Sequence, residues 1–121
     1  MQEINLYDIN GEPVAYIASD MEHSIYTWDG HAVCYLVNDY VYGWNGLHLG
    51  WFIDGIMYDV NGYRVGFTKE KCPHWVKFAP LKSLKYLKSL KNLRNLPYIK
   101  PWFKYDASDM LLLDFLKQGA N

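Results

Sequence analysis

Residues 7–11 read YDING, and the same motif returns as YTWDG at 26–30, YGWNG at 42–46 and YDVNG at 58–62. The residue five places after each motif glycine is aromatic in every copy: Tyr16, Tyr35, Trp51 and Phe67. Successive motif glycines are 19, 16 and 16 residues apart. Self-similarity at such a period indicates a repeated supersecondary unit, and the period is too short for propeller blades, which need about 40 residues each. We therefore predict four copies of one small unit.

The dipeptides Asn-Gly and Asp-Gly at the end of each motif predict the type of unit. Either dipeptide between two alternating apolar runs is a strong β-hairpin signal, because a type I′ turn needs positive φ at both central residues. In such a two-residue turn the flanking residues pair directly. In the first unit Ile9 would then pair with Glu12, and Leu6 with Ala15.

Alternation along the strands divides each predicted hairpin into two faces. One face is aromatic in every unit, and in the first unit it carries Tyr7, Ile9, Val14 and Tyr16. We expect the four hairpins to share this face as an aromatic interior, since a lone hairpin is marginal in water. The opposite face has a small residue in each copy, and small side chains there predict close approach of another backbone. These small residues are Ala15, Cys34, Gly50 and Gly66.

The four motifs resemble those of the bacterial four-fold beta-flower domain family, specifically over residues 4–70 and more loosely beyond. The resemblance implies four hairpin petals around a pseudo-four-fold axis, and a period-three tail that straps them. It implies no activity. We predict a mainly β fold of four hairpin repeats, followed by an extended period-three strap and a short C-terminal helix. Residues 1–70 would form the hairpin array, and residues 71–121 would pack on it within a single domain.

The tail after Pro80 has a period of three residues. Leucine stands at every third position from Leu81 to Leu96. On an α-helix such leucines would spiral around the cylinder, whereas polyproline II, with three residues per turn, keeps them on one edge. A 3₁₀-helix shares the period but rarely exceeds 3 to 4 residues. The helix propensity of Leu and Lys opposes the extended form, so both conformations stay open, and we favour an extended strap whose leucines line the hairpins.

A short helix is expected at the end of the chain. Ser108 is a suitable N-cap, and Lys117 and Gly119 are typical of a helix C-terminus. The apolar residues between them are Leu112, Leu113, Phe115 and Leu116. A helix this short must dock on the rest of the fold, and we expect it to cap one end of the hairpin array.

Composition restricts the class of protein. The chain has 121 residues, half of them apolar and 17% aromatic, which fits one globular domain and excludes disorder. No apolar run approaches the roughly 20 residues of a membrane span. The N-terminal segment Met1–Asn5 has no features of a secretory signal, so we expect a cytoplasmic protein without membrane contact. The net charge of −1 creates no field that would attract nucleic acid, which makes such a partner unlikely.

The sequence contains no convincing catalytic or metal-binding motif. His31, Cys34, Cys72 and His74 could supply zinc ligands, but their spacing is not that of a zinc finger, and Cys34 fills a small-residue position of the repeat. His31 and Cys34 would project from opposite faces of their strand, which argues against a catalytic thiol–imidazole pair. Phosphate-binding, serine-hydrolase and zinc-protease motifs are absent from the sequence. We expect no catalytic residues, no metal and no cofactor.

Two functions of different class remain. The first is a non-enzymatic scaffold or protein-interaction module that contacts a partner through the cations of the strap, which would form its solvated edge: Lys82, Lys85, Lys88, Lys91 and Arg94. The alternative is a binder of a small ligand, a sugar or a quaternary amine, through aromatic faces of the hairpins. The residues of that site would be Trp28, Trp44, Trp51, Tyr40 and Tyr63, although hydrophobic packing also explains them.

Overall fold

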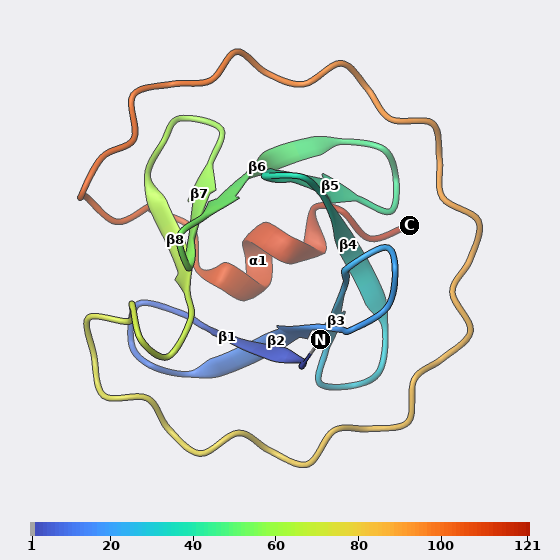
Figure 1. Ribbon diagram of the computed structural model, residues 1–121, viewed down its shortest axis with the longest axis horizontal. Helices are drawn as coiled ribbons and strands as arrows, with labels where there is room; N and C mark the ends of the chain where they lie inside the picture. The colour runs from blue at the N-terminus through green and yellow to red at the C-terminus, as the bar shows by residue number, and fades with distance from the viewer. Residues whose placement is uncertain (1) are drawn as a thin grey trace.

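The computed structural model describes residues 2–121, so Met1 of the N-terminal segment lies outside it. These residues form eight strands and one helix: β1 (Ile4–Tyr7), β2 (Pro13–Ile17), β3 (Ser24–Thr27), β4 (Ala32–Val37), β5 (Tyr40–Gly43), β6 (His48–Ile53), β7 (Ile56–Asp59), β8 (Arg64–Phe67) and α1 (Leu112–Lys117). Each strand pairs antiparallel with the next, and Tyr7 of β1 pairs with Phe67 of β8. The result is a closed barrel of four hairpins, as the repeat predicted (Figure 1).

Each hairpin ends in a three-residue turn, so the predicted two-residue turn is wrong. In the first hairpin the Asp8 amide donates to the Glu12 carbonyl at 3.0 Å, and the Gly11 amide donates to the Asp8 carbonyl at 3.0 Å. Gly11 has a φ of 79°, which makes this a type I turn followed by a left-handed glycine. The same pair of bonds recurs at the other three turns. Ile9 therefore lies in the turn and does not pair with Glu12.

A β-bulge beside each turn restores the register. In the first hairpin Tyr7 lies opposite Pro13 and Leu6 opposite Ala15, which leaves Val14 as the extra residue. The bulge compensates for the longer turn, so the predicted pair Leu6–Ala15 is confirmed. The equivalent pairs are Ile25–Cys34, Val41–Gly50 and Met57–Gly66. The bulge also turns Val14 to the inner face, where it packs on the core, and not to the predicted aromatic face.

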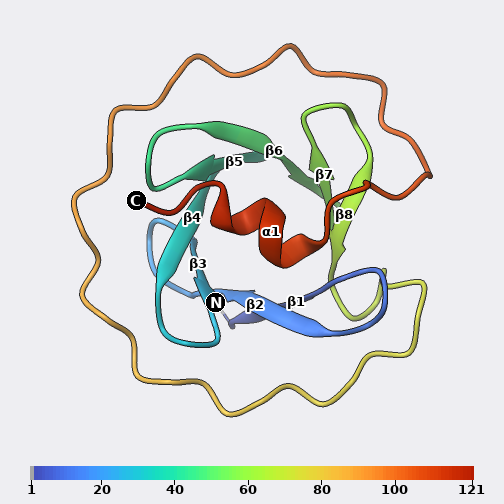
Figure 2. The ribbon, with the colours of Figure 1, turned by 180° about the vertical axis from the view of Figure 1, so that it is seen from behind.

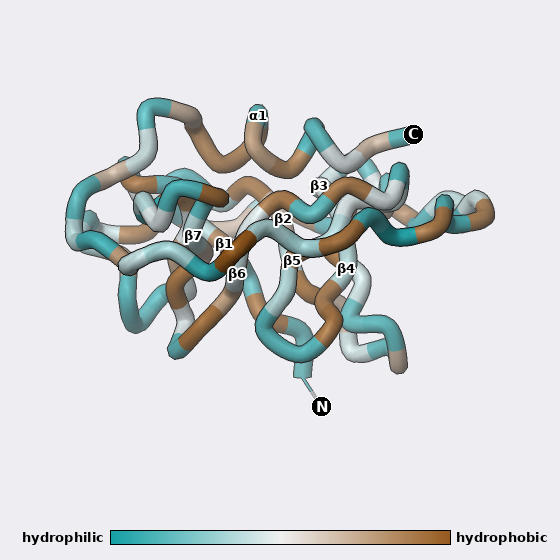
Figure 3. Tube along the Cα trace, turned by 90° about the horizontal axis from the view of Figure 1, so that it is seen from above, coloured by the Kyte–Doolittle hydropathy of each residue, from teal (hydrophilic) through white to brown (hydrophobic). Residues whose placement is uncertain are grey.

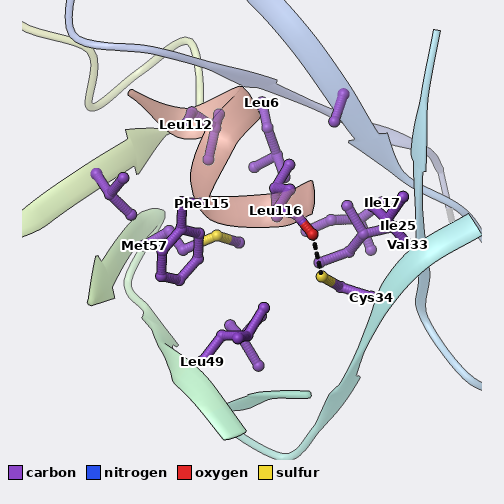
Figure 4. Packing of buried hydrophobic residues seen from close by; sticks show 13 residues of the cluster. Leu6, Ile17, Ile25, Val33, Cys34, Leu49, Met57, Leu112, Phe115 and Leu116 are labelled. Carbon is purple, nitrogen blue, oxygen red and sulfur yellow. Dashed lines mark hydrogen bonds between the residues drawn. The ribbon is translucent and has the colours of Figure 1, made fainter. Parts of the chain in front are cut away.

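The interior of the barrel is aliphatic, and the prediction of an aromatic interior is wrong. Leu6, Ile25, Val41 and Met57 are fully buried there, and Phe115 is the aromatic member of this cluster (Figure 4). The repeated aromatic residues alternate with these inner residues along the strands, so they lie on the outside of the barrel. Buried tyrosines, Trp44 and Phe67 form three separate clusters there. The face with the small residues points inward, and its small side chains leave room for the helix.

Helix α1 covers one end of the barrel, as expected of a docked cap. It lies within the ring of strands in Figure 1 and on one side of the barrel in Figure 3. Leu112, Phe115 and Leu116 are buried in the barrel interior. The helix begins at Leu112 without a side-chain cap, and the Ser108 hydroxyl instead accepts a bond from the Met110 amide at 3.2 Å. No helix among residues 2–121 is both long and apolar enough to cross a membrane.

The close approach of another backbone that the small residues predicted occurs at Gly50, where a Cβ atom would lie 1.9 Å from the carbonyl oxygen of Tyr58 on β7. Gly66 and Cys34 instead contact α1. A Cβ atom on Gly66 would lie 2.8 Å from Leu112 Cδ1, and one on Gly43 would lie 2.4 Å from the Cα of Gly119. The Cys34 thiol donates to the Leu116 carbonyl at 3.4 Å (Figure 4). Larger side chains at Gly66, Gly43 and Cys34 would displace α1 or the residues after it.

Residues 73–105, here called the strap, form neither helix nor strand and run around the outside of the barrel (Figures 1 and 2). The backbone bonds of the strap go to the hairpins, as in an extended chain without internal hydrogen bonds. The preference for an extended conformation over a helix is therefore confirmed.

Candidate functional site

The strap bonds to the four hairpin turns at intervals of nine residues. The amides of Lys77, Tyr86, Asn95 and Lys104 donate to the carbonyls of Gly11, Gly30, Gly46 and Gly62 at 2.9, 3.0, 2.8 and 2.9 Å. Nine residues are three turns of a chain with three residues per turn, so the same row of the strap meets every hairpin. The four-fold repeat of the hairpins is thus matched by a repeat in the strap.

The motif glycines are required at these contacts for two reasons. Their φ angles lie between 79° and 93°, a region that residues with a Cβ rarely adopt. A Cβ on Gly30 would also lie 2.2 Å from the carbonyl oxygen of Leu84. The strap carbonyls that meet the other three glycines belong to Trp75, Leu93 and Trp102. The sequence motif therefore encodes both the turn and the seat for the strap.

The strap cations face the barrel, which corrects the expectation that they form its solvated edge. The Nζ atoms of Lys82 and Lys91 lie 4.5 Å and 4.3 Å from the ring centroids of Tyr16 and Tyr35. Arg94 lies 5.7 Å from the ring of Tyr42. Each such contact contributes about 0.5–1 kcal/mol at an exposed site. The cations are thus bound by the outer aromatic surface of the hairpins.

Carboxylates of the first hairpins pair with these cations. Glu3 pairs with Lys82 and Lys85, and Glu22 pairs with Lys88 and Lys91. The side chains of the four lysines are 30–45% exposed. The hydrogen bond from Lys82 lowers the pKa of Glu3, and that from Lys88 lowers the pKa of Glu22. The predicted partner surface of cations is therefore engaged within the chain.

Asp20 completes this ionic arrangement. It accepts bonds from the Ser24 amide at 2.8 Å and from Lys88 Nζ at 2.9 Å. Burial alone would raise the pKa of Asp20, but the bonds from Ser24 and Lys88 lower it to about 2. Asp20 and Glu22 belong to the longer loop between the first two hairpins, so this loop fixes the part of the strap that contains Lys88 and Lys91.

With three residues per turn, the strap has three rows of side chains. One row contains the residues whose amides bond to the hairpins, one contains the cations, and the third faces solvent and is hydrophobic throughout. We call it the apolar rim, and its eleven residues are Trp75, Phe78, Leu81, Leu84, Leu87, Leu90, Leu93, Leu96, Ile99, Trp102 and Tyr105. Each is at least 88% exposed. The prediction that the leucines line the hairpins is therefore wrong, because the cations occupy that side. Figure 3 shows hydrophobic and hydrophilic residues in close succession along the strap.

The predicted aromatic ligand site is not assembled. Trp44 and Trp51 are 2% and 1% exposed, and Trp44 Nε1 donates to the Ser89 carbonyl at 2.7 Å. Trp28 packs on Tyr16 with ring centroids 5.3 Å apart. Tyr40 pairs with Trp51 across β5 and β6 and packs on His48, and Tyr63 lies under the Lys104 ammonium. Tyr40, Trp44 and Trp51 belong to the third hairpin, where both tryptophans are buried, while Trp28 and Tyr63 belong to the second and fourth hairpins. The chain's own cations cover the rings of Trp28, Trp44 and Tyr63.

The candidate metal and thiol residues are also placed apart. His31 stacks on Tyr86 with ring centroids 4.2 Å apart. Cys34 is buried, and burial raises the pKa of its thiol. The Cys72 thiol donates to the Asp8 carbonyl at 3.4 Å. Across residues 2–121 no three His, Cys, Asp or Glu side chains gather in a way that could hold a metal ion.

His48 is a buried titratable residue that the sequence analysis missed. Its Nδ1 accepts a bond from the Tyr98 amide at 2.9 Å, and its Nε2 lies 2.9 Å from the Gly50 carbonyl. An Nδ1 that accepts leaves Nε2 as the protonated donor, so the ring is neutral. Burial lowers the pKa of His48. The only signal in the sequence is that His48 stands where other units have Pro13, Ala32 or Arg64.

A recess of about 630 Å³ lies beside the strap between the second and third hairpins. It is lined by Val33, Trp44, Tyr86, Leu87 and Ser89 among others. Of the five predicted ligand-binding residues only Trp44 reaches it, so the recess was not foreseen from the repeat.

One family model matches the chain, that of the 4-fold beta flower protein, over residues 4–116. Searches among curated proteins and among solved structures find no match. The matched segment contains the four hairpins, the strap and nearly all of α1. The chain therefore belongs to the 4-fold beta flower protein family.

Proposed function

We propose that the protein is a non-enzymatic scaffold or interaction module that binds a protein partner through its apolar rim. The observation that carries the proposal is the full exposure of this row of side chains. The largest apolar patch of a typical monomer is about 300–600 Å² and often functional. Burial of the four aromatic rim residues alone, Trp75, Phe78, Trp102 and Tyr105, would cover roughly 600–1,000 Å².

The fold itself does not require the rim to be apolar. The strap is held by backbone bonds to the hairpin glycines and by the cations on the aromatic surface. The rim side chains point away from both. An exposed row with no structural task is ordinarily polar, so its hydrophobic character supports a contact outside the chain.

A capture experiment with matched variants tests the proposal. The rim variant carries Leu84→Gln, Leu87→Gln and Leu90→Gln, and the control carries Leu47→Gln, Leu111→Gln and Leu113→Gln, which replace partly exposed leucines elsewhere. Circular dichroism first verifies that both are folded. We expect proteins retained from a host lysate by the native chain and the control to be lost from the rim variant. Equal retention by all three would overturn the proposal.

The alternative function, a binder of a small ligand, is supported by the recess beside Trp44 and Tyr86. Its wall combines the aromatic residues Trp44 and Tyr86 with aliphatic residues and the polar Ser89 and Asn121, and aromatic faces beside polar groups suit a sugar or a quaternary amine. A ligand of this class should raise the melting temperature of the native chain, and Ser89→Trp, which fills the recess, should abolish the shift. A shift that survives this substitution would exclude the recess as the site.

A further inference from the structure

The spacing of the side chains in the apolar rim restricts which partner surfaces can pack against it. Three residues of polyproline II advance about 9 Å, so neighbouring rim side chains such as Leu87 and Leu90 stand about 9 Å apart. A tightly packed partner must present apolar side chains at the same spacing, offset by half a step. A second strap has this spacing by construction. In a two-fold arrangement the leucines of one strap would enter the gaps between those of the other, which is a self-complementary contact.

The charges beside the rim permit such a contact. Two identical surfaces bring like charges together, so a free row of lysines next to the leucines would oppose pairing. Here Lys82 and Lys85 are paired with Glu3, and Lys88 and Lys91 with Glu22. Four lysines thus share the carboxylates of Glu3, Asp20 and Glu22, so most of the positive charge beside the leucines is offset within the chain.

The shape of the strap favours a second copy over a membrane. The strap runs around the side of the barrel (Figures 1 and 3), and its rim residues are exposed there. A barrel that lies with one end on a bilayer would therefore keep most of the rim away from the membrane. The strap meets hairpin tips at Trp75, Leu84, Leu93 and Trp102, which define three sides. Each side is about 28 Å long and can pack edge to edge with a side of another copy.

The area of one side predicts the strength of the contact. Three leucines from each copy bury roughly 60–120 Å² apiece, or roughly 400–700 Å² in all. A stable interface needs about 1,000 Å² or more, so a single pair of sides binds weakly. Three sides per chain allow several weak contacts at once, and this favours assemblies larger than a dimer at high concentration.

We propose, on the basis of the proposed function of the rim, that its partner is a second copy of this chain, packed strap against strap. Sedimentation velocity over a wide concentration range tests this. The weight-average mass of the native chain should rise above the 14.2 kDa monomer as concentration increases. The mass of the variant Leu84→Gln, Leu87→Gln, Leu90→Gln should rise less, and that of the control at Leu47, Leu111 and Leu113 should follow the native chain.

Cysteine cross-linking adds a readout that does not depend on affinity. Leu87→Cys and Leu90→Cys are introduced together with Cys72→Ser, while the buried Cys34 is kept. Residues about 9 Å apart are too distant to bridge within one strap, so disulfides at these positions must join two copies. We expect covalent dimers under mild oxidation, and far fewer with Leu47→Cys and Leu111→Cys as the matched pair.

Three outcomes would overturn the inference. The first is a monomeric native chain at every concentration, and the second is a rise in mass that the rim variant shares. The third is rim-dependent sedimentation with phosphatidylcholine vesicles in place of self-association. If the chain stays monomeric while the rim variant loses a captured protein, the inference fails and the proposed interaction module stands.

Discussion

At the scale of single residues, each motif glycine both adopts positive φ in its turn and leaves room for the strap. Comparison of Gly30 with Gly55, a turn glycine that does not contact the strap, separates the two effects on stability. Gly30 and Gly55 both have positive φ, 93° and 80°. A Cβ on Gly30 would meet the backbone oxygen of Leu84 at 2.2 Å, whereas one on Gly55 would meet side-chain atoms of Thr68 and Lys71 at 2.8 and 2.9 Å. Side chains can move away and a bonded backbone cannot, so the two sites share the turn strain and differ in the strap contact.

We predict that Gly30→Ala lowers the free energy of unfolding more than Gly55→Ala does. Both variants lose roughly 1–2 kcal/mol from the left-handed backbone. Gly30→Ala in addition displaces the strap, which should accelerate hydrogen exchange of the Tyr86 amide that bonds to the Gly30 carbonyl. Urea titration and hydrogen exchange measure the two effects. Equal losses at the two glycines, with unchanged exchange at Tyr86, would show that the strap does not depend on this contact.

His48 should make stability depend on pH. Burial lowers the pKa of His48 below its ordinary value of 6.5, so the unfolded chain binds more protons than the folded chain once the pH falls below about 6.5. This contribution to stability is full above that pH and is lost as the pH falls toward the folded pKa. His48→Asn should flatten the fall in urea midpoint between neutral and mildly acidic pH. His74→Gln at an exposed position is the control, and an unchanged slope for His48→Asn would contradict the prediction.

The hairpin register shows how far sequence reasoning reaches at this scale. The pair Leu6–Ala15 was predicted correctly although the turn type was not, and the equivalent pair Met57–Gly66 has the same register. The longer turn shifts the pairing by one residue, and the extra residue of the bulge shifts it back, so the predicted register is restored at Leu6 and Ala15. Asp8 helps to decide the turn, because its Oδ1 accepts bonds from the Asn10 and Glu12 amides at 2.9 and 3.0 Å. Such local side-chain bonds compete with the backbone pattern and are hard to predict from the Asn-Gly dipeptide alone.

At the scale of elements, the period of the strap was readable and its orientation was not. Leucines and cations occupy adjacent rows of an extended chain, and period alone leaves either row free to face the hairpins. Which row faces the hairpins depends on whether the aromatic side chains of the hairpins point into the barrel or out of it. The sequence predicted aromatics in the interior and leucines against the hairpins, and both predictions were wrong. In the structure Tyr16 and Tyr35 lie outside the barrel, and with Glu3 and Glu22 they form the surface that binds the cations.

We predict that reversing the strap charges loosens one side of the strap and leaves the barrel intact. In the variant Lys82→Glu, Lys85→Glu the new carboxylates face Glu3, and the two ion pairs, each about 0.2–1 kcal/mol, are lost. Hydrogen exchange should accelerate at the Ser83 and Tyr86 amides, which bond to Trp28 and Gly30. Exchange within the paired strands should not change.

Charge exchange provides the control for this prediction. Adding Glu3→Lys to the double variant restores opposite charges and should return the exchange rates of both amides toward their native values. High salt should weaken the native pairs in the same direction as the substitution, since these side chains are partly exposed. If the double variant exchanges like the native chain, the backbone bonds alone hold this side.

At the scale of the whole molecule, barrel and helix share one hydrophobic interior. The small residues Ala15, Cys34 and Gly66 make room for α1, and Leu116 fills that room with none of its surface exposed. The strands therefore enclose an incomplete core without the helix, and a helix of six residues is too short to persist alone. Each part needs the other, which argues for a single cooperative domain that includes both the array of residues 1–70 and the C-terminal segment.

The last prediction follows from this mutual dependence. Leu116→Ala should lower the free energy of unfolding of the entire domain by about 2–5 kcal/mol, because it opens a cavity where the helix meets the strands. Leu113→Ala, at a position 38% exposed on the same helix, should cost less than about 1 kcal/mol. Urea unfolding followed by far-ultraviolet circular dichroism and by tryptophan fluorescence should give coincident transitions for both variants. Were Leu116→Ala to shift only one signal, the strands and α1 would be separate folding units, and the helix would be an appended cap without a role in closing the core.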